Sequence, residues 1–253
     1  MDLGLRDRVY LVTGGTRGLG LATARALVDD GARVVVTGRD EKRAAEAVAE
    51  LGGPEQALGI AADNGESGTA ERLVAAALAR FERLDGALVS VGGPPAGAIT
   101  AIEDDQWRDA FESVFLGAVR LARATASALG NGGSIGFVLS SSVRQPIPGL
   151  GVSNGLRPGL AMVAKTLADE LGPRGIRVFG LLPGRIDTDR VRELDGLSGD
   201  AEASRTRHAQ SIPLARYGTP EEFGRVAAFT LSPAASYLSG VMIPVDGGLT
   251  RSL

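Results

Sequence analysis

Apolar runs of strand length alternate with amphipathic helical patterns along almost the whole chain. In the helical segments apolar residues recur about every three to four positions, whereas the strand segments are short continuous apolar runs. Strands are predicted at residues 8–13, 33–37, 56–61, 86–91, 134–140, 176–182 and 241–245. Helices are predicted between them at residues 19–30, 41–51, 67–81, 104–129, 157–171 and 220–231. This alternation indicates right-handed crossovers, and therefore an α/β fold whose single doubly wound, parallel, seven-stranded sheet has helices on both faces.

The segment 187–211 departs from this pattern. It is polar, carries many charges and contains Gly196 and Gly199, and it lies between the sixth strand and the last helix. A long polar insertion after the carboxyl end of a strand is typical of a mobile substrate lid, and a solvated loop is the alternative. Because no composition break or repeat marks a boundary, residues 1–253 are interpreted as one domain with a lid at about 187–211.

Composition narrows the classes of function. Hydrophobic residues make up 44% and aromatic residues 4%, which suits aliphatic strands buried under helices. A net charge of −3 with scattered Lys and Arg makes a nucleic-acid partner unexpected. The chain has no cysteine and one histidine, His208, so neither disulfides nor a metal site are expected. The charged first residues predict no signal peptide, and no apolar run is long enough for a membrane span. A soluble cytoplasmic protein is therefore expected.

A glycine-rich turn follows the first predicted strand and leads directly into a helix. Gly14, Gly18 and Gly20 match the pattern G-x-x-x-G-x-G. Such glycines permit the tight turn, the approach of a pyrophosphate to the backbone, and the close packing of helix on strand. The helix N-terminus adds free N–H groups and a positive dipole for the phosphates. The turn therefore predicts a Rossmann-type dinucleotide site, and Thr16, Arg17 and Leu19 complete it.

The end of the second strand selects the cofactor. Folds that bind NAD usually carry Asp or Glu there, to accept hydrogen bonds from the adenosine ribose. Here Thr37 is followed by Gly38 and Arg39, and Arg17 in the glycine turn is a second cation. Two guanidinium groups are suited to binding a 2′-phosphate, so NADP(H) is favoured over NAD(H). Asp40 is expected to cap the next helix, and Asp63 is a candidate acceptor for the adenine amino group.

The chain resembles the short-chain dehydrogenase/reductase family, especially its 3-oxoacyl-acyl-carrier-protein reductase-like members. The likeness covers essentially the whole length. It implies a homotetramer, and it implies that residues near the sixth strand hold the nicotinamide end of the cofactor. In addition to the glycine-rich turn, Arg39 and Asp63, the residues interpreted as cofactor-binding are Asn64, Gly92, Pro183, Gly184, Ile186 and Thr188. The motifs that carry the resemblance are residues 13–20, Ile212-Pro213-Leu214, Arg216, Gly218, Pro220-Glu221-Glu222, residues 236–240 and Val245-Asp246-Gly247-Gly248.

The resemblance also implies a catalytic Asn, Ser, Tyr and Lys, of which only the Ser is present. Ser140 matches it, with Ser141 and Ser142 beside it, whereas Ser153 stands at the Tyr position and Arg157 at the Lys position. The Asn position is Val114. A serine hydroxyl ionises far above the phenol pKa of ~10, so Ser153 is a poor proton donor. Arg157 stays cationic, so it attracts an oxyanion or holds ribose, and it too is interpreted as cofactor-binding.

Three functions follow. The first is an NADP(H)-dependent reductase of a small carbonyl substrate, 3-oxoacyl-like or another small ketone. In it Ser140 and Arg157 stabilise the developing alkoxide, and water or a lid residue such as His208 supplies the proton. The second is a catalytically inactive protein that binds NADP(H) or a ligand. The third is a serine hydrolase, because residues 151–155 match G-x-S-x-G around Ser153, with Asp187 or Asp189 and His208 following. A loop rather than a strand precedes that serine, which disfavours the hydrolase.

Overall fold

The computed structural model describes residues 2–197 and 199–252, which contain a parallel seven-stranded sheet of order β3-β2-β1-β4-β5-β6-β7. The chain begins at the centre of the sheet, runs to one edge through β2 and β3, and returns to β4. The strand order therefore reverses between β1 and β4, the position at which open α/β sheets form their ligand crevice. The predicted fold class is confirmed. The strands are β1 (Val9–Val12), β2 (Arg33–Gly38), β3 (Ala57–Ala61), β4 (Gly86–Val89), β5 (Ser134–Val138), β6 (Arg177–Pro183) and β7 (Met242–Val245).

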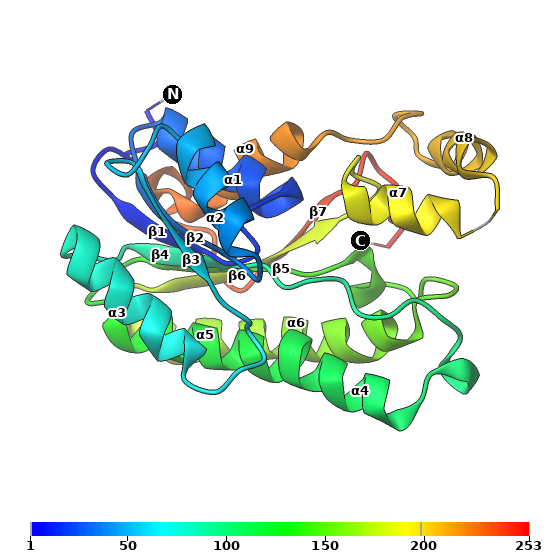
Figure 1. Ribbon diagram of the computed structural model, residues 1–253, viewed down its shortest axis with the longest axis horizontal. Coiled ribbons are helices and arrows are strands. Elements are labelled where there is room, and N and C mark those ends of the chain that lie inside the picture. Colours follow the sequence, from blue (N-terminus) through cyan, green and yellow to red (C-terminus); the bar gives the residue numbers. More distant parts are fainter. Residues whose placement is uncertain (1, 198, 253) are drawn as a thin grey trace.

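Helices cover both faces of the sheet (Figure 1). One face carries α1 (Gly18–Asp29), α2 (Glu41–Glu50) and α9 (Pro220–Leu231). The other face carries α3 (Thr69–Phe81), α4 (Asp104–Ala110), α5 (Gly117–Ala128) and α6 (Gly151–Leu171). A π-helical segment, Phe111–Leu116, joins α4 to α5, so the long helix predicted at 104–129 is helical throughout but widened in its middle.

Each strand packs apolar side chains against both helical layers. Leu11 and Val35 belong to the core cluster beneath α3, α5 and α6, whereas Tyr10, Val12 and Val34 belong to the cluster beneath α1 and α9. All five side chains are at most 1% exposed. This arrangement is why the strand segments of the sequence read as continuous apolar runs rather than as alternating ones.

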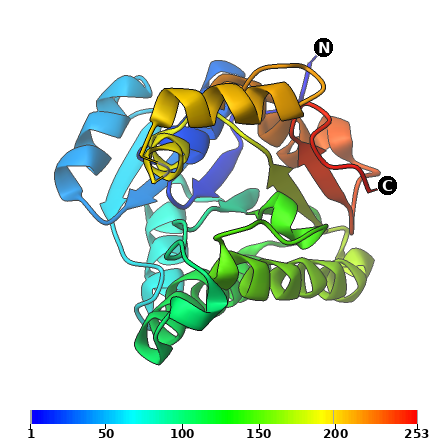
Figure 2. The same ribbon diagram turned by 90° about the vertical axis from the view of Figure 1, so that its right-hand side faces the viewer.

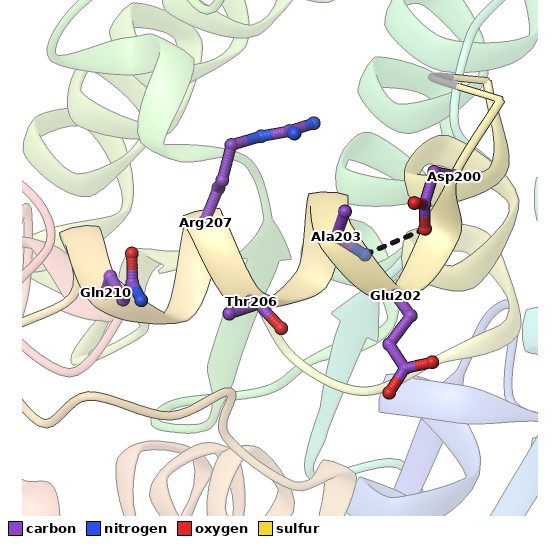
Figure 3. Close-up of a pocket in the computed structure, with 6 residues that line it drawn as sticks. All are labelled: Asp200, Glu202, Ala203, Thr206, Arg207 and Gln210. Carbon is purple, nitrogen blue, oxygen red and sulfur yellow. Dashed lines mark hydrogen bonds between the residues drawn. The ribbon is translucent and has the colours of Figure 1, made fainter.

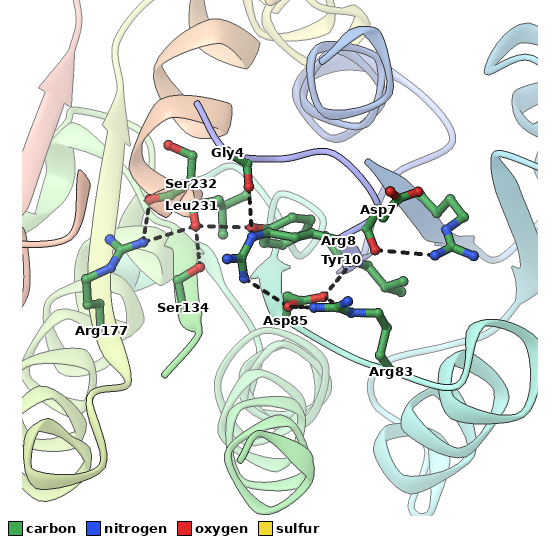
Figure 4. A network of polar contacts seen from close by, with 12 residues as sticks. Gly4, Asp7, Arg8, Tyr10, Arg83, Asp85, Ser134, Arg177, Leu231 and Ser232 are labelled. Carbon is green, nitrogen blue, oxygen red and sulfur yellow. Dashed lines mark hydrogen bonds and ion pairs between the residues drawn. The ribbon is translucent and has the colours of Figure 1, made fainter. Parts of the chain in front are cut away.

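Polar contacts hold together the amino-terminal ends of the central strands, as Figure 4 shows. The Asp85 carboxylate, 9% exposed, accepts hydrogen bonds from Arg8, Arg83 and the Val9 N–H. Nearby, Arg177 donates to the carbonyl oxygens of a turn at the end of α9, including that of Leu231. A buried carboxylate is stable only with such partners. The amino-terminal ends of the strands therefore have a structural role. The carboxyl-terminal ends of the strands are left to form the site.

Two differences from the sequence-based prediction matter for the site. The helix predicted to begin at Arg157 begins at Gly151, so Ser153 and Arg157 lie on one helix, α6. The predicted lid segment is largely helical, with α7 (Asp189–Gly196) and α8 (Ala201–Ser211). Figure 2 shows α8 running across the upper part of the carboxyl edge of the sheet, with α7 seen end-on beside it. Opening and closing of this segment stays a prediction.

Candidate active site

The candidate site lies at the carboxyl ends of the central strands. There the loop after β1 and the loop after β4 are tied together, because Thr13 Oγ1 donates to the Ser90 carbonyl at 2.8 Å and accepts from the Ser90 N–H at 2.9 Å. Ser140 directly follows the residue after β5, and Pro183 ends β6. Four neighbouring strands, β1, β4, β5 and β6, therefore bring their loops to the same end of the sheet, beside the point where the strand order reverses.

The glycine-rich turn has a backbone that other residues would disturb. Gly18 has a φ of +53°, and a Cβ at Gly20 would collide with the carbonyl group of Gly14. The α1 helix begins at Gly18, so the N–H groups of Gly18, Leu19 and Gly20 lie in its first turn without intrahelical partners. Thr16 packs directly on Gly38 at the end of β2, where a side chain would not fit. The turn has the form that cradles a pyrophosphate.

The cations predicted to bind a 2′-phosphate are both accessible. Arg39 is exposed immediately after β2, and the adjacent Asp40 accepts a hydrogen bond from the Arg43 N–H at 3.0 Å, which confirms that Asp40 caps α2. Arg17 lies 3.9 Å from Asp189 in an ion pair whose side chains are 59% and 66% exposed. Such surface pairs contribute about 0–1 kcal/mol. Asp189 therefore competes only weakly with a phosphate for Arg17.

The predicted adenine contacts lie at the end of β3. One carboxylate oxygen of Asp63 accepts from the Gly65 N–H at 2.8 Å. The carbonyl group of Asn64 lies against Gly117, at the start of α5, where a Cβ would not fit. Both residues are half-buried in the loop that follows β3. A role for either toward adenine stays a prediction.

The residues predicted to hold the nicotinamide end approach the glycine turn from the opposite side. The Gly184 N–H donates to the Val245 carbonyl, and Ile186 forms a bridge with Gly218. Thr188 then caps α7, and its methyl group lies 3.5 Å from where a Cβ on Gly18 would stand. The structure thus brings the loop after β6 into contact with the turn after β1.

The serine–arginine cluster, which we define as Ser140, Ser142, Ser153 and Arg157, lies where the loop after β5 meets the first turns of α6. The Ser142 N–H donates to Ser140 Oγ at 3.1 Å, and the hydroxyl oxygens of Ser142 and Ser153 are 3.3 Å apart. Ser142 and Ser153 are 4% and 6% exposed, whereas Ser140 is half-buried. Sequence reasoning placed Ser142 beside Ser140 but did not predict its contact with Ser153, because eleven residues separate the two.

Arg157 stands one helical turn after Ser153, so both side chains leave the same face of α6. Its Nη1 donates to the Val138 carbonyl at 2.7 Å, and its Nη2 donates to the Gly92 carbonyl at 3.4 Å. The side chain is buried, and Nε has no hydrogen-bond partner in the described chain. Burial lowers the pKa of Arg157 to about 10, which leaves the guanidinium protonated at neutral pH. Val114, at the remaining catalytic position, is a core side chain.

The α7 helix also covers the loop after β4. Arg190 Nη2 donates to the Pro94 carbonyl at 2.8 Å, and Arg190 Nε occupies the space beside Gly93. Sequence reasoning assigned no role to Arg190, since a charge in a polar insertion has no pattern that marks a contact. With Thr188 at its first turn, α7 thus bridges the loops after β1 and β4.

A buried carboxylate joins α7 to α8. Asp195 is 3% exposed and accepts hydrogen bonds from Tyr217 Oη at 3.0 and 3.1 Å and from Arg185 Nη1 at 3.0 Å. Ser204 Oγ, on α8, contacts the same carboxylate at 3.4 Å. Burial is the largest cause that raises the pKa of Tyr217 to about 12, so the phenol stays protonated. Neither the pairing nor the burial was predicted.

His208 belongs to this structural cluster, which argues against a role as the proton donor of the site. Its Nε2 is 2.8 Å from Arg185 Nη2, and its Nδ1 is 3.3 Å from Ser204 Oγ. Because a guanidinium only donates, Nε2 is the acceptor and carries no proton to give away. The interpretation of His208 as a residue without a catalytic role is favoured.

The state of His208 gives a pH prediction. Burial and then Arg185 lower the pKa of His208 below its usual 6.5, so the folded protein holds the ring neutral. As the pH falls below 6.5, the ring is protonated in the unfolded chain before it is protonated in the folded protein. The free energy of unfolding therefore falls as the pH is lowered from 6.5 to the pKa of His208 in the folded protein. We expect His208→Gln to remove this part of the pH dependence in urea unfolding at pH values on either side of 6.5. An identical pH dependence in both proteins would contradict the neutral, arginine-bound ring.

The serine hydrolase interpretation is wrong. Ser153 lies in the first turn of α6, and the preceding strand, β5, ends at Val138, so no strand runs into the serine. Its hydroxyl contacts Ser142, whereas His208 contacts Arg185 and Ser204. A nucleophile elbow requires a strand–turn–helix geometry and a serine–histidine hydrogen bond.

A shallow hollow on the outer face of α8 (Figure 3) is formed by residues of that helix and its cap, so no second element provides an opposite wall. Its lining residues are Asp200, Glu202, Ala203, Thr206, Arg207 and Gln210. Within residues 2–197 and 199–252, no three His, Asp or Glu side chains are grouped to hold a metal ion, and no helix is long and apolar enough to cross a membrane.

The sheet order and the glycine turn beside the point of strand reversal define a protein of the α/β dinucleotide-binding class. A family model described as enoyl-(acyl carrier protein) reductase matches residues 14–250. An uncharacterized oxidoreductase of Methylorubrum extorquens is 34% identical over 249 residues, or 97% of this chain and 98% of its own. Human dehydrogenase/reductase SDR family member 4 is 34% identical over 254 residues, or 98% and 90%. The chain belongs to the short-chain dehydrogenase/reductase family.

A solved structure gives the same fold in detail. L-sorbose reductase from Gluconobacter frateurii, complexed with NADPH and L-sorbose, superposes with a TM-score of 0.94. It is 29% identical, and the match covers 100% of both chains. The likeness extends over the 187–211 segment as well as the sheet.

Proposed function

We propose that this protein is an NADP(H)-dependent reductase that transfers a hydride to a small carbonyl compound. The observation that carries the proposal is the glycine turn with two accessible arginines, Arg17 and Arg39, and no carboxylate at the end of β2. The positive φ of Gly18 and the N–H groups of the first turn of α1 suit the turn to a bound pyrophosphate, and the close approach at Gly20 lets the helix pack onto the strand. The L-sorbose reductase complexed with NADPH supports the same choice of cofactor.

Each part of the crevice has a role in this proposal. The first turn of α1 binds the pyrophosphate, and the Pro183-Gly184 turn with Thr188 holds the nicotinamide end. The cofactor, when bound, supplies the hydride. Ser140 donates a hydrogen bond to the substrate oxygen, because its hydroxyl acts only as an acceptor in the hydrogen bonds of residues 2–197 and 199–252. The buried charge of Arg157 stabilises the negative charge that develops there.

Cofactor choice has a direct test. We expect Arg39→Ala to weaken NADPH binding by roughly 1.5–3 kcal/mol, the contribution of a charged hydrogen bond, and to leave NADH binding nearly unchanged. Titration calorimetry with both cofactors measures this. Arg43→Ala is the matched control, since Arg43 lies on the same exposed surface one turn into α2 and its described hydrogen bond uses only the backbone N–H. If Arg39→Ala weakened the binding of NADPH and NADH equally, the assignment of Arg39 to the 2′-phosphate would be overturned.

A second candidate function is an NADP(H)-binding protein without turnover. The observation in its favour is Ser153 in place of a phenol, together with a buried valine at position 114. Oxidation of NADPH in the presence of 3-oxoacyl thioesters, diketones and quinones separates the two functions. Binding without oxidation of NADPH by any of these compounds favours the binding protein. A cytoplasmic location and a homotetramer stay predictions.

A further inference from the structure

The loop after β4 lies against a guanidinium from α7. Gly92 and Gly93 are exposed, and a Cβ on Gly92 would meet no atom of the described chain within 4 Å beyond its own neighbours. Arg190 Nη2 donates to the Pro94 carbonyl at 2.8 Å, and Arg190 Nε lies 2.6 Å from where a Cβ on Gly93 would stand. The cation therefore stands beside exposed main chain at the carboxyl-terminal end of the sheet.

Among the described residues, the one carboxylate that pairs with Arg190 is exposed. Arg190 Nη1 donates to Glu193 Oε1 at 2.8 Å, and the two side chains are 33% and 63% exposed. A pair so exposed is weak, because water screens both charges. Arg190 Nε donates to no residue within 2–197 and 199–252. A carboxylate of a ligand can therefore bind Arg190 with little loss of protein contacts, and a guanidinium is the side chain best shaped to bind one.

A second guanidinium holds the same loop. Arg157 Nη2 donates to the Gly92 carbonyl at 3.4 Å, and Arg157 Nη1 donates to the Val138 carbonyl at 2.7 Å. The side chain is 5% exposed, Nε has no partner in the described chain, and burial is the one cause that moves the pKa of Arg157. No acidic group in residues 2–197 and 199–252 therefore offsets this charge. A buried charge without a partner is costly, so it attracts an anionic ligand that binds nearby.

The loop that the two arginines hold begins beside Ser140. The strands β4 and β5 are paired with Val89 opposite Phe137. Gly92 and Ser140 each follow their paired residue by three positions, so the two loops start at the same level of the sheet. Neighbouring strands are about 4.8 Å apart. A small substrate whose carbonyl oxygen lies at Ser140 is therefore within reach of the loop and of Arg190.

We propose that Arg190 binds a carboxylate of the substrate, so that the carbonyl compounds reduced by this protein are small oxo acids. This inference rests on the proposed function and names its substrate class. Ser140 holds the carbonyl oxygen, and Arg190 fixes the other end of the molecule by charge-assisted hydrogen bonds. The uncompensated charge of Arg157 adds an attraction for the same anion. A neutral ketone of equal size gains neither interaction.

The reaction balances without any change in the carboxylate. The carbonyl carbon gains a hydrogen with its bonding electron pair from the reduced nicotinamide, which is thereby oxidised, and the carbonyl π pair moves onto oxygen. Water supplies the proton that completes the hydroxyl group. Arg190 binds and orients the substrate, so it is a specificity residue rather than a proton donor.

Matched acids and methyl esters test the inference. Pyruvate and methyl pyruvate share the carbonyl group and carbon chain and differ in charge, and acetoacetate and methyl acetoacetate repeat the comparison with the carboxylate one carbon further away. We expect the wild-type protein with NADPH to reduce at least one acid with a kcat/KM at least ~10-fold above that of its ester. Arg190→Gln should lower this acid-to-ester ratio by ~10–10²-fold, the contribution of a charged hydrogen bond, chiefly through the KM of the acid.

Two further variants on α7 separate recognition from a merely structural tether. Glu193→Gln removes the carboxylate that competes for Arg190, so it should raise the acid-to-ester ratio by up to ~5-fold, the range of an exposed ion pair. Arg192→Gln is the matched control, because it removes the same charge from the same helix, but its guanidinium pairs with Asp187 and Asp189. It should leave the ratio unchanged.

Binding of the reduced products supplies a readout that does not depend on turnover. Lactate, 3-hydroxybutyrate and their methyl esters cannot react in the presence of NADPH, because both partners are already reduced. Titration calorimetry on the protein with NADPH should show that at least one acid binds at least ~10-fold more tightly than its ester, and that Arg190→Gln removes this preference. The comparison of acid with ester in the wild type needs no variant, so it stands even where Arg190→Gln does not fold.

The outcomes separate the inference from the proposed function. Reduction of the esters as efficiently as the acids, or an Arg190→Gln variant that loses acid and ester turnover equally, would overturn the inference and leave the reductase in place. Acid-selective binding that requires Arg190, without NADPH oxidation by any acid or ester, would overturn the proposed reduction and leave Arg190 as an anion-binding residue. Equal binding of acids and esters together with no turnover of either would overturn both.

Discussion

Replacing Ser153 by Tyr together with Arg157 by Lys is expected to raise the rate of ketone reduction by ~10²–10⁴-fold, the usual contribution of general acid catalysis. Both positions lie on the same face of α6, one turn apart, so the phenol and the ammonium would stand close enough for the cation to lower the phenol pKa. Either change alone should do little, because the phenol needs the ammonium and the ammonium has no proton shuttle without the phenol. NADPH oxidation with a 3-oxoacyl thioester or with cyclohexanone measures the effect.

Ser153→Phe with Arg157→Lys is the matched control for this experiment. It brings the same ring into the space beside Ser142 but offers no hydroxyl, so it should show no gain in ketone reduction. Both double variants should be compared for NADPH affinity and for urea unfolding. If the Tyr variant folds, binds NADPH and is no faster than the Phe variant, position 153 does not face the reacting carbonyl.

Removal of the buried Asp195 carboxylate is expected to have the largest effect on stability. Asp195→Ala leaves the Tyr217 hydroxyl and Arg185 without the acceptor that they share. Loss of one partner of a fully buried pair costs ~3–5 kcal/mol, and because Arg185 is 21% exposed we expect about 2–3 kcal/mol in the free energy of unfolding. Urea unfolding measures the total, and limited proteolysis shows whether the 187–211 segment opens first.

Asp189→Ala is the control on the same helix. Its carboxylate is 66% exposed and pairs with Arg17 and Arg192 on the surface, so the change should stay within about 0.5 kcal/mol. If Asp195→Ala and Asp189→Ala lowered the free energy of unfolding equally, the burial of Asp195 would not explain its contribution to stability. Asp195→Asn, which keeps the shape and one acceptor, should fall between the two.

The sheet could be predicted well because each buried strand is a continuous apolar run. Such a run is visible in consecutive residues of the sequence. The apolar pattern placed the start of α6 too late, at Arg157, because Gly151, Gly155 and Pro158 all disfavour a helix interior. Contacts of the fold override that preference. The side chain of Asn154, for example, exchanges hydrogen bonds with both the N–H and the carbonyl of Ile147, which fixes the loop against the first turn.

The helices α7 and α8 escaped prediction for a different reason. Only Ser204 is buried along α8, so no apolar stripe marks the helix in the sequence. What organises this segment is a capping Asp200 and the distant partners of Asp195, among them Tyr217. Partners that lie far along the chain leave no local pattern. The glycine turn was predictable because its function is encoded in consecutive residues, whereas the Ser142–Ser153 contact joins two separate elements.

The glycine turn and the serine–arginine cluster also differ in what encodes them. The positive φ of Gly18 and the close approach at Gly20 are properties of the main chain, whose peptide N–H groups are presented whatever side chains surround them. At Ser153 and Arg157, by contrast, the chemistry is carried by side chains that stand one turn apart on α6. Sequence drift can therefore alter the reaction of such a protein while its affinity for the cofactor persists. Retention on a nucleotide affinity column is accordingly a poor guide to retained catalysis.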